Sequence, residues 1–124
     1  MGNDNKVCLN RILIVDDNID IRLLLKKRLE TAGYTVTEAE NGFEATQSLL
    51  TTPPCVIILD LMMPVMDGWQ FLEWKRSQSE GLANVPVVVV SAVSDFHQKP
   101  DGVVGFLKKP VSVTHMIDYI QNYC

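Results

Sequence analysis

Short apolar runs rich in β-branched residues alternate along the chain with segments of helical periodicity, and this alternation most strongly limits the fold. Strands are predicted at 11–15, 34–38, 56–59, 87–90 and 103–107. Helices are predicted at 19–32, 41–50, 68–77 and 113–123, with 79–84 as a loop. Because the strand runs are almost continuously apolar and no hairpin signal joins them, we expect a parallel sheet covered by helices on both faces. Right-handed crossovers make this a doubly wound, five-stranded α/β fold.

The first predicted helix carries an apolar stripe at three- and four-residue spacing, which is expected to face the sheet: Ile21, Leu24, Leu25, Leu29 and Ala32. Gly33 follows at the position where a helix end favours a left-handed residue. The next strand, 34–38, alternates between polar and apolar residues, which is typical of an edge strand.

The composition predicts one cytoplasmic domain. A chain of 124 residues with 47% hydrophobic and 21% charged residues has the length of one domain and is too apolar to be disordered. Its longest apolar runs, 56–59 and 85–90, are far shorter than the roughly 18 residues of a membrane span, and its first residues lack the pattern of a signal peptide. The net charge of −4, without a dense block of Lys and Arg, disfavours direct binding to nucleic acid. We therefore expect no membrane and no nucleic-acid contact.

The three cysteines are widely spaced: Cys8, Cys55 and Cys124. Their number is odd, they form no Cys-x-x-Cys pair, and only two histidines accompany them. This pattern predicts neither a disulfide nor a zinc site, and Cys55, which opens an apolar run, is interpreted as a buried thiol.

Polar side chains follow several predicted strands at the point where each strand ends. Asp16 and Asp17 follow the first strand, Asp60 the third, Ser91 the fourth, and Lys109 lies just beyond the fifth. In an open parallel sheet these ends share one edge, so the groups are expected to converge there. Three neighbouring carboxylates repel one another unless a cation is present, and hard oxygen ligands favour Mg²⁺. The pattern predicts Asp60 as a nucleophile toward a phosphoryl group, with Asp17 on the metal, Asp16 acting through water, and Lys109 and Ser91 on the phosphoryl oxygens.

Four motifs in this order resemble the receiver domain of two-component response regulators: ILIVDD at 12–17, DLMMPVMDG at 60–68, VSA at 90–92 and FLKKP at 106–110. The resemblance extends over nearly the whole chain and implies a receiver domain at 9–124 after an extension at 1–8. It implies a flavodoxin-like sheet of strand order 2-1-3-4-5. It also implies phosphorylation by a histidine kinase or a histidine phosphotransfer protein.

Residue by residue, the resemblance implies that Asp60 is the phosphoacceptor. Asp16, Asp17, Asp60 and the backbone carbonyl of Met62 would hold Mg²⁺ or Mn²⁺. Ser91 and Phe106 would be the switch residues that respond to phosphorylation. Lys109, rather than Lys108, would be the lysine of the site because it directly precedes Pro110, through a bond that is typically cis in the family.

The segment between Ser91 and Lys109 is shorter than in most members of the family, and it contains Pro100. The fourth helix of the family, placed here at 94–101, is therefore expected to be short or irregular, because a proline inside a helix costs about 3 kcal/mol. In the family this helix, the fifth strand and the last helix form the surface for a downstream protein.

Other functions fit the residues less well. A phosphatase of the haloacid dehalogenase type would need a second Asp two residues after Asp60, where Met62 stands, and a flavin-binding module would not place Asp16 and Asp17 beside a phosphate. The complete set of site residues also disfavours a receiver that never takes a phosphoryl group. We expect a phosphorylation-dependent signalling switch that is no enzyme beyond Mg²⁺-dependent self-phosphorylation and slow autodephosphorylation. The resemblance implies that the residues two positions after Asp60 and Ser91 orient the attacking water, and here these are Met62 and Val93, which offer it no strong hydrogen bond. The alternative is a phosphorelay receiver from a hybrid histidine kinase or multidomain regulator.

Overall fold

The fold is described from a computed structural model, which covers residues 10–63, 65–91 and 102–124. The strands are β1 (Arg11–Val15), β2 (Thr35–Ala39), β3 (Val56–Asp60), β4 (Val87–Ser91) and β5 (Val103–Lys108). The helices in these residues are α1 (Ile19–Thr31), α2 (Gly42–Thr51), α3 (Gly68–Arg76), α4 (Glu80–Ala83) and α5 (Val113–Gln121). None of them is long and apolar enough to cross a bilayer.

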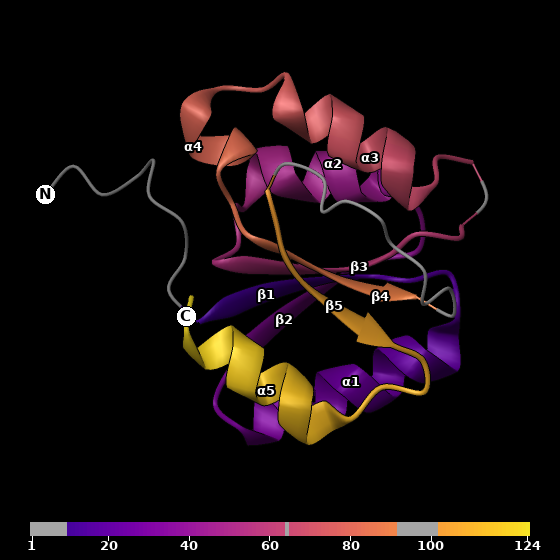
Figure 1. The fold of residues 1–124 in the computed structure, drawn as a ribbon, viewed down its shortest axis with the longest axis vertical. Coiled ribbons are helices and arrows are strands. Elements are labelled where there is room, and N and C mark those ends of the chain that lie inside the picture. Colours follow the sequence, from indigo (N-terminus) through magenta and orange to yellow (C-terminus); the bar gives the residue numbers. More distant parts are fainter. Residues whose placement is uncertain (1–9, 64, 92–101) are drawn as a thin grey trace, which may run out of the picture.

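The strands form one parallel sheet of order β2-β1-β3-β4-β5, as expected from the sequence. Helices α2, α3 and α4 cover one face, and α1 and α5 cover the other (Figure 1). Strand β2 lies at an edge, which confirms the interpretation of its weaker alternation.

Two hydrophobic cores, one on each face of the sheet, explain why the strands read as continuous apolar runs. Successive strand residues point to opposite faces, so Leu13 and Ile12 enter different cores. Leu13 packs in the core that holds Phe71 of α3, whereas Ile12 packs in the core that holds Met116 of α5. Every residue of β3 is buried, including the terminal Asp60, so this strand is enclosed on both sides.

The helix boundaries follow from polar caps. Asn18, Asn41 and Ser112 each accept a backbone N–H bond in the first turn of α1, α2 and α5. Asp67 forms a reciprocal capping box with Gln70 at the start of α3. Gly33, with φ of 102°, adopts the left-handed conformation expected after α1.

The expected apolar stripe of α1 is partly wrong. Leu25 and Leu29 face the sheet, but Leu24 is 54% exposed and Ala32 is also exposed. The buried position one turn before Leu25 is occupied by Arg22 instead. Its guanidinium has hydrogen-bond partners inside the fold, so a charged side chain can occupy this stripe without the cost of an unpaired buried charge.

The loop expected at 79–84 contains the short helix α4, so that prediction is also wrong. Four residues are too few to show helical periodicity in the sequence. The buried Lys75 of α3 donates a 2.6 Å hydrogen bond to the carbonyl of Ala83, which provides a partner for the last turn of α4. The segment expected to form the short or irregular fourth helix, 94–101, lies outside the described residues.

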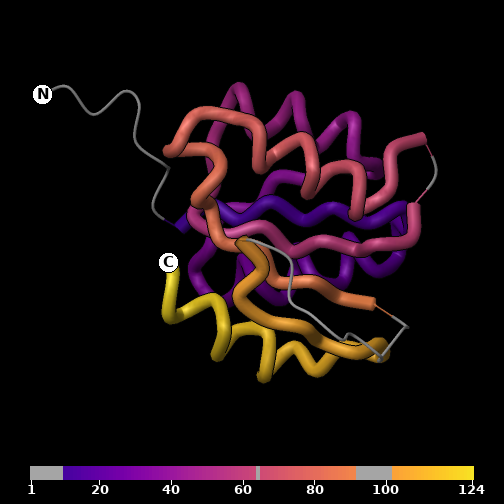
Figure 2. Tube along the Cα trace, turned by 45° about the horizontal axis from the view of Figure 1, so that its top comes forward, coloured from indigo at the N-terminus to yellow at the C-terminus, as the bar shows by residue number. Residues whose placement is uncertain are grey.

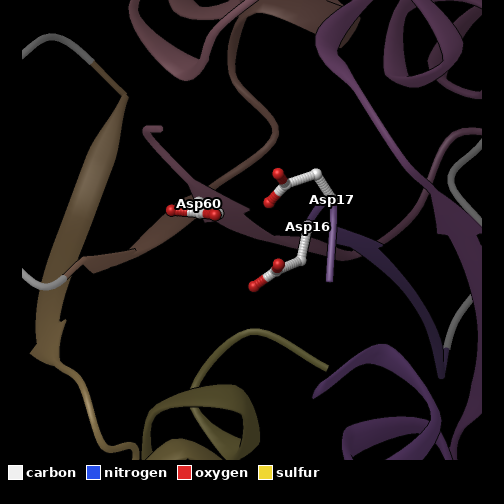
Figure 3. A group of neighbouring side chains, drawn as sticks. All are labelled: Asp16, Asp17 and Asp60. Carbon is white, nitrogen blue, oxygen red and sulfur yellow. The ribbon is translucent and has the colours of Figure 1, made fainter. Parts of the chain in front are cut away.

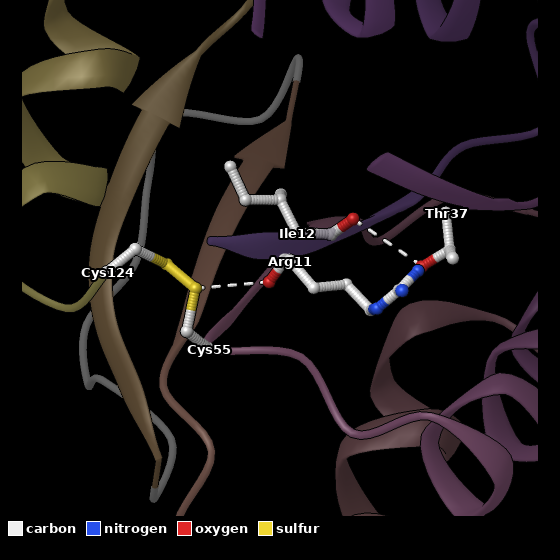
Figure 4. The surroundings of a disulfide bond; sticks show 5 residues. All are labelled: Arg11, Ile12, Thr37, Cys55 and Cys124. Carbon is white, nitrogen blue, oxygen red and sulfur yellow. Dashed lines mark hydrogen bonds between the residues drawn. A yellow bond between two sulfur atoms is a disulfide. The ribbon is translucent and has the colours of Figure 1, made fainter. Parts of the chain in front are cut away.

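The prediction that the chain has no disulfide is wrong for Cys55, which is bonded to Cys124 (Figure 4). The two Cα atoms are 5.5 Å apart, although the residues are separated by 69 positions in the sequence. Cys55 directly precedes β3, and the chain end after α5 returns beside the start of β1 (Figures 1 and 2). The fold therefore brings the two sulfurs together in a way that their sequence spacing does not reveal. Cys8 lies outside the described residues.

Candidate functional site

Three carboxylates meet at the carboxyl edge of the sheet (Figure 3). Asp16 and Asp17 follow β1, Asp60 ends β3, and one oxygen of each lies within 4.8 Å of the others. The two strands are neighbours, so the topology brings the acids together as expected. Asp16 and Asp60 are buried whereas Asp17 is exposed, so the group opens to solvent on the Asp17 side.

The Asp60 carboxyl has a pKa above its usual 3.8. Burial is the largest cause, and the negative charge of Asp16 acts in the same direction. The Met62 N–H, 3.2 Å from Oδ1, and the Lys109 ammonium act in the opposite direction. Hard carboxylate oxygens that repel one another and are partly open to water fit a divalent cation such as Mg²⁺ or Mn²⁺.

Lys109 reaches the acidic group from the far side of β4. Its Nζ lies 3.4 Å from Oδ2 of Asp16 and 3.4 Å from Oδ2 of Asp60. The Lys109–Pro110 bond is cis, as expected, and the Lys109 N–H donates to the carbonyl of Ser91. Lys108, the other lysine of this segment, is exposed.

The loop after Asp60 is held against the start of α3. The Gly68 N–H donates to the carbonyl of Leu61, and a Cβ at Gly68 would lie 2.6 Å from Leu61 Cα and 2.7 Å from the Asp60 carbonyl oxygen. Only glycine fits this approach, and the Asp67 carboxylate caps α3, so the Asp67–Gly68 pair fixes where the loop ends and the helix begins. Met62 lies two residues after Asp60, donates its N–H to Asp60 Oδ1 and is 65% exposed.

Ser91 and Phe106 lie on the neighbouring strands β4 and β5. Ser91 ends β4 and is fully buried. Phe106 is half-buried and packs against the core that includes Leu59 and Phe71. On its other side it lines a shallow surface groove with His115 and Tyr119 of α5. Ser91 pairs with Lys108 of β5, two residues beyond the pairing of Val89 with Phe106.

Sequence reasoning missed Arg22 and Glu38, which lie directly behind the acidic group. Nη1 of Arg22 donates a 2.6 Å hydrogen bond to the backbone carbonyl of Asp16, and Nε donates to Oε1 of Glu38 at 3.2 Å. A signal was present in the sequence, because Arg22 lies three and seven residues before the buried Leu25 and Leu29. A charged residue on the buried stripe of a helix usually has a partner inside the fold.

The comparisons with known proteins give the family. The model of the response regulator receiver domain matches residues 12–121. A probable transcriptional regulator, ycf27, of Porphyridium aerugineum is 36% identical over 92 residues, covering 74% of this chain and 37% of that protein. The sensor histidine kinase TmoS of Ectopseudomonas mendocina is 34% identical over 116 residues, covering 90% of this chain and 12% of that protein. The structure of the chemotaxis response regulator CheY4 of Vibrio cholerae superposes with a TM-score of 0.84 at 30% identity, covering 94% of this chain and all of that one.

The chain belongs to the family of response regulator receiver domains, the receivers of two-component signalling systems. It spans a little over a third of the length of the first curated relatives that it matches.

Proposed function

We propose that this receiver domain accepts a phosphoryl group on Asp60 in the cytoplasm and passes the signal on through a change at its surface. The observation that carries the proposal is the arrangement around Asp60, where two further carboxylates and the ammonium of Lys109 converge on one buried oxygen pair. Membership in the receiver family supports a histidine kinase or a histidine phosphotransfer protein as the phosphodonor.

In the proposed reaction an oxygen of Asp60 attacks the phosphorus of a phosphohistidine. The new O–P bond forms as the P–N bond breaks, and the electron pair of that bond stays on the imidazole nitrogen, which takes up a proton. Lys109 lies 3.4 Å from Asp60 Oδ2 and is placed to neutralise one phosphoryl oxygen, while the Ser91 hydroxyl donates to another. The cation would be held by the carboxylates of Asp16, Asp17 and Asp60 with the Met62 carbonyl. When bound it supplies positive charge for the remaining phosphoryl oxygens.

Mass spectrometry after treatment with acetyl phosphate and Mg²⁺ tests the proposal. We expect one adduct with the mass of a phosphoryl group, located on Asp60, and no adduct when EDTA is present. Asp60→Asn should abolish it. Asp67→Asn is the matched control, because Asp67 lies in the same loop but its carboxylate caps α3. Labelling that survives Asp60→Asn, or that does not need a divalent cation, would refute the proposal.

We further propose that Ser91 and Phe106 couple phosphorylation to the surface. The Ser91 hydroxyl would move toward the phosphoryl group, and Phe106 would turn into the space that it leaves, which shifts the balance between two packings of β5 and α5. Ser91→Ala should leave phosphorylation largely intact and weaken binding of the downstream protein. NMR spectra of the phosphorylated variant that still show the full change at Phe106 would contradict this coupling.

A second candidate is a phosphorelay receiver that passes the phosphoryl group on. The likeness to part of the sensor histidine kinase TmoS supports it. Mixing the phosphorylated chain with a purified histidine phosphotransfer domain distinguishes the two. Rapid return of the phosphoryl group to histidine would favour the relay, and loss only by slow hydrolysis would favour the terminal switch.

A further inference from the structure

A buried arginine, Arg22, lies behind the acidic group at the fourth residue of α1. Arg22 Nη1 donates to the Asp16 carbonyl at 2.6 Å, and Arg22 Nε donates to Glu38 Oε1 on β2 at 3.2 Å. The second oxygen of Glu38 lies 3.4 Å from Lys26 Nζ, so Glu38 is itself held in place. The Arg22–Glu38 pair therefore links α1 and β2 to the backbone of Asp16.

Asp16 is fixed at each of its polar groups. Its N–H donates to the carbonyl of Ala39, its Oδ1 accepts from the Asn18 N–H at 2.9 Å, and its Oδ2 lies 3.4 Å from Lys109 Nζ. The carbonyl is held by the guanidinium, and a hydrogen bond from a charged donor is roughly twice as strong as a neutral one. This carbonyl belongs to the peptide that joins Asp16 to Asp17, so its orientation sets the direction in which both carboxylates leave the backbone.

We propose that Arg22 is a positioning residue for the divalent-cation site, and that it acts by holding the peptide between Asp16 and Asp17. The inference rests on the proposed function, in which these carboxylates hold the cation. Glu38 accepts from Arg22 Nε and so holds the guanidinium in the orientation that reaches the Asp16 carbonyl. Both members of the Arg22–Glu38 pair are therefore needed to hold this peptide. Groups that orient metal ligands from behind in this way typically change metal affinity by about 10- to 100-fold when they are removed.

The direction in which the cation affinity changes when Arg22 is removed distinguishes a positioning role from a purely electrostatic one. A guanidinium close to the site repels a divalent cation, so its removal should tighten cation binding if charge alone matters. If Arg22 orients the ligands, its removal should weaken binding in spite of the lost repulsion. A purely structural role would lower the free energy of unfolding and leave the affinity of the folded protein unchanged.

The experiment measures Mn²⁺ binding to the full chain, without any phosphodonor, from the electron paramagnetic resonance signal of free Mn²⁺. Arg22→Met should raise the Kd about tenfold. Arg22→Lys keeps the charge, but one ammonium cannot replace the fork that reaches both acceptors, so the Kd should rise by a smaller factor. Lys27→Met is the matched control, because it removes the same charge from an exposed position on the same helix and leaves the Arg22–Glu38 pair unchanged. It should change the Kd by no more than about twofold, as expected for a screened charge near the surface.

Unchanged or tighter Mn²⁺ binding in Arg22→Met would overturn the inference, as would wild-type affinity in Arg22→Lys or an equal loss in Lys27→Met. If Arg22→Met does not fold, Arg22→Lys and Glu38→Gln carry the test, and each should raise the Kd severalfold. Asp16→Asn distinguishes a failure of the proposed cation site from a failure of the role of Arg22. If Asp16→Asn binds Mn²⁺ as well as the wild type, the proposed function fails. If it weakens binding and the Arg22 variants do not, only the inference fails.

Discussion

Reduction of the Cys55–Cys124 disulfide should lower the free energy of unfolding substantially. The bond closes a loop between residues 69 positions apart, and the chain-entropy relation gives about 4 kcal/mol for a loop of that size. The Cys55 sulfur also lies 3.1 Å from the carbonyl oxygen of Arg11 (Figure 4). It has no proton while it is bonded to Cys124, and as a thiol it becomes a weak donor to that oxygen. We therefore expect a measured loss somewhat below the entropic value.

Urea unfolding with and without a phosphine reductant measures this difference, with the fluorescence of Trp69 and Trp74 on α3 as the signal. The protein is prepared in a Cys8→Ser background, so that no third thiol exchanges with the pair. Cys124→Ser should match the reduced protein and should not respond to the reductant. Equal midpoints for the oxidised and reduced protein, with equal denaturant slopes, would refute the reasoning, and so would a Cys124→Ser variant that still responds to reductant.

Three further changes test other parts of the structure. Because the folded-state pKa of Asp60 lies above 3.8, the free energy of unfolding that this group contributes falls as the pH rises through the interval above 3.8. Asp60→Asn should therefore stabilise the protein at neutral pH in EDTA and have little effect in acid, as measured by urea unfolding. Val65→Gly should stabilise the fold by about 1 kcal/mol in thermal unfolding, because Val65 has a φ of 69° that a β-branched residue adopts only with strain. Met62→Asn should speed the loss of the phosphoryl group severalfold, by giving water a hydrogen-bond partner beside Asp60, with Mn²⁺ affinity unchanged. Val93, the other residue expected to slow this loss, lies outside the described residues.

The features that could be predicted from the sequence depend on periodicity and on the direction of the strands. Every strand of the sheet is recovered to within a residue or two. The signal is clearest for β1, β3 and β4, whose apolar runs are continuous because both of their faces are buried. Parallel strands place their carboxyl ends at one edge, so the sequence alone predicts the grouping of Asp16, Asp17 and Asp60 that the structure shows. The chemistry of these strand ends predicts Asp60 as the nucleophile, and the resemblance to the receiver family adds the switch roles of Ser91 and Phe106 and the metal role of the Met62 carbonyl.

The features that were missed depend on contacts between distant residues. Arg22 reads as a polar residue in an amphipathic helix, and its burial follows from the partners that β1 and β2 supply. Cys55 and Cys124 are brought together by the path of the chain, which the odd number of cysteines obscured. Helix α4 is too short to carry a period, and part of its stability comes from Lys75 on another helix.

The carboxyl edge of the sheet concentrates groups that oppose folding, since burial and the charge of Asp16 both raise the pKa of Asp60. Two positively charged side chains, Lys109 and Arg22, approach this region from different elements. Lys109 approaches the carboxylates themselves, and Arg22 approaches the backbone behind them. Lys109 therefore shares the space that a phosphoryl group would enter, whereas Arg22 is held away from that space by Glu38. Under the proposed function, Lys109 would contact the phosphoryl group and Arg22 would not, and the two side chains belong to different elements, the segment after β5 and helix α1. This division predicts that Arg22 keeps its contacts in both signalling states, and that the change on phosphorylation travels through the β4 and β5 side of the sheet.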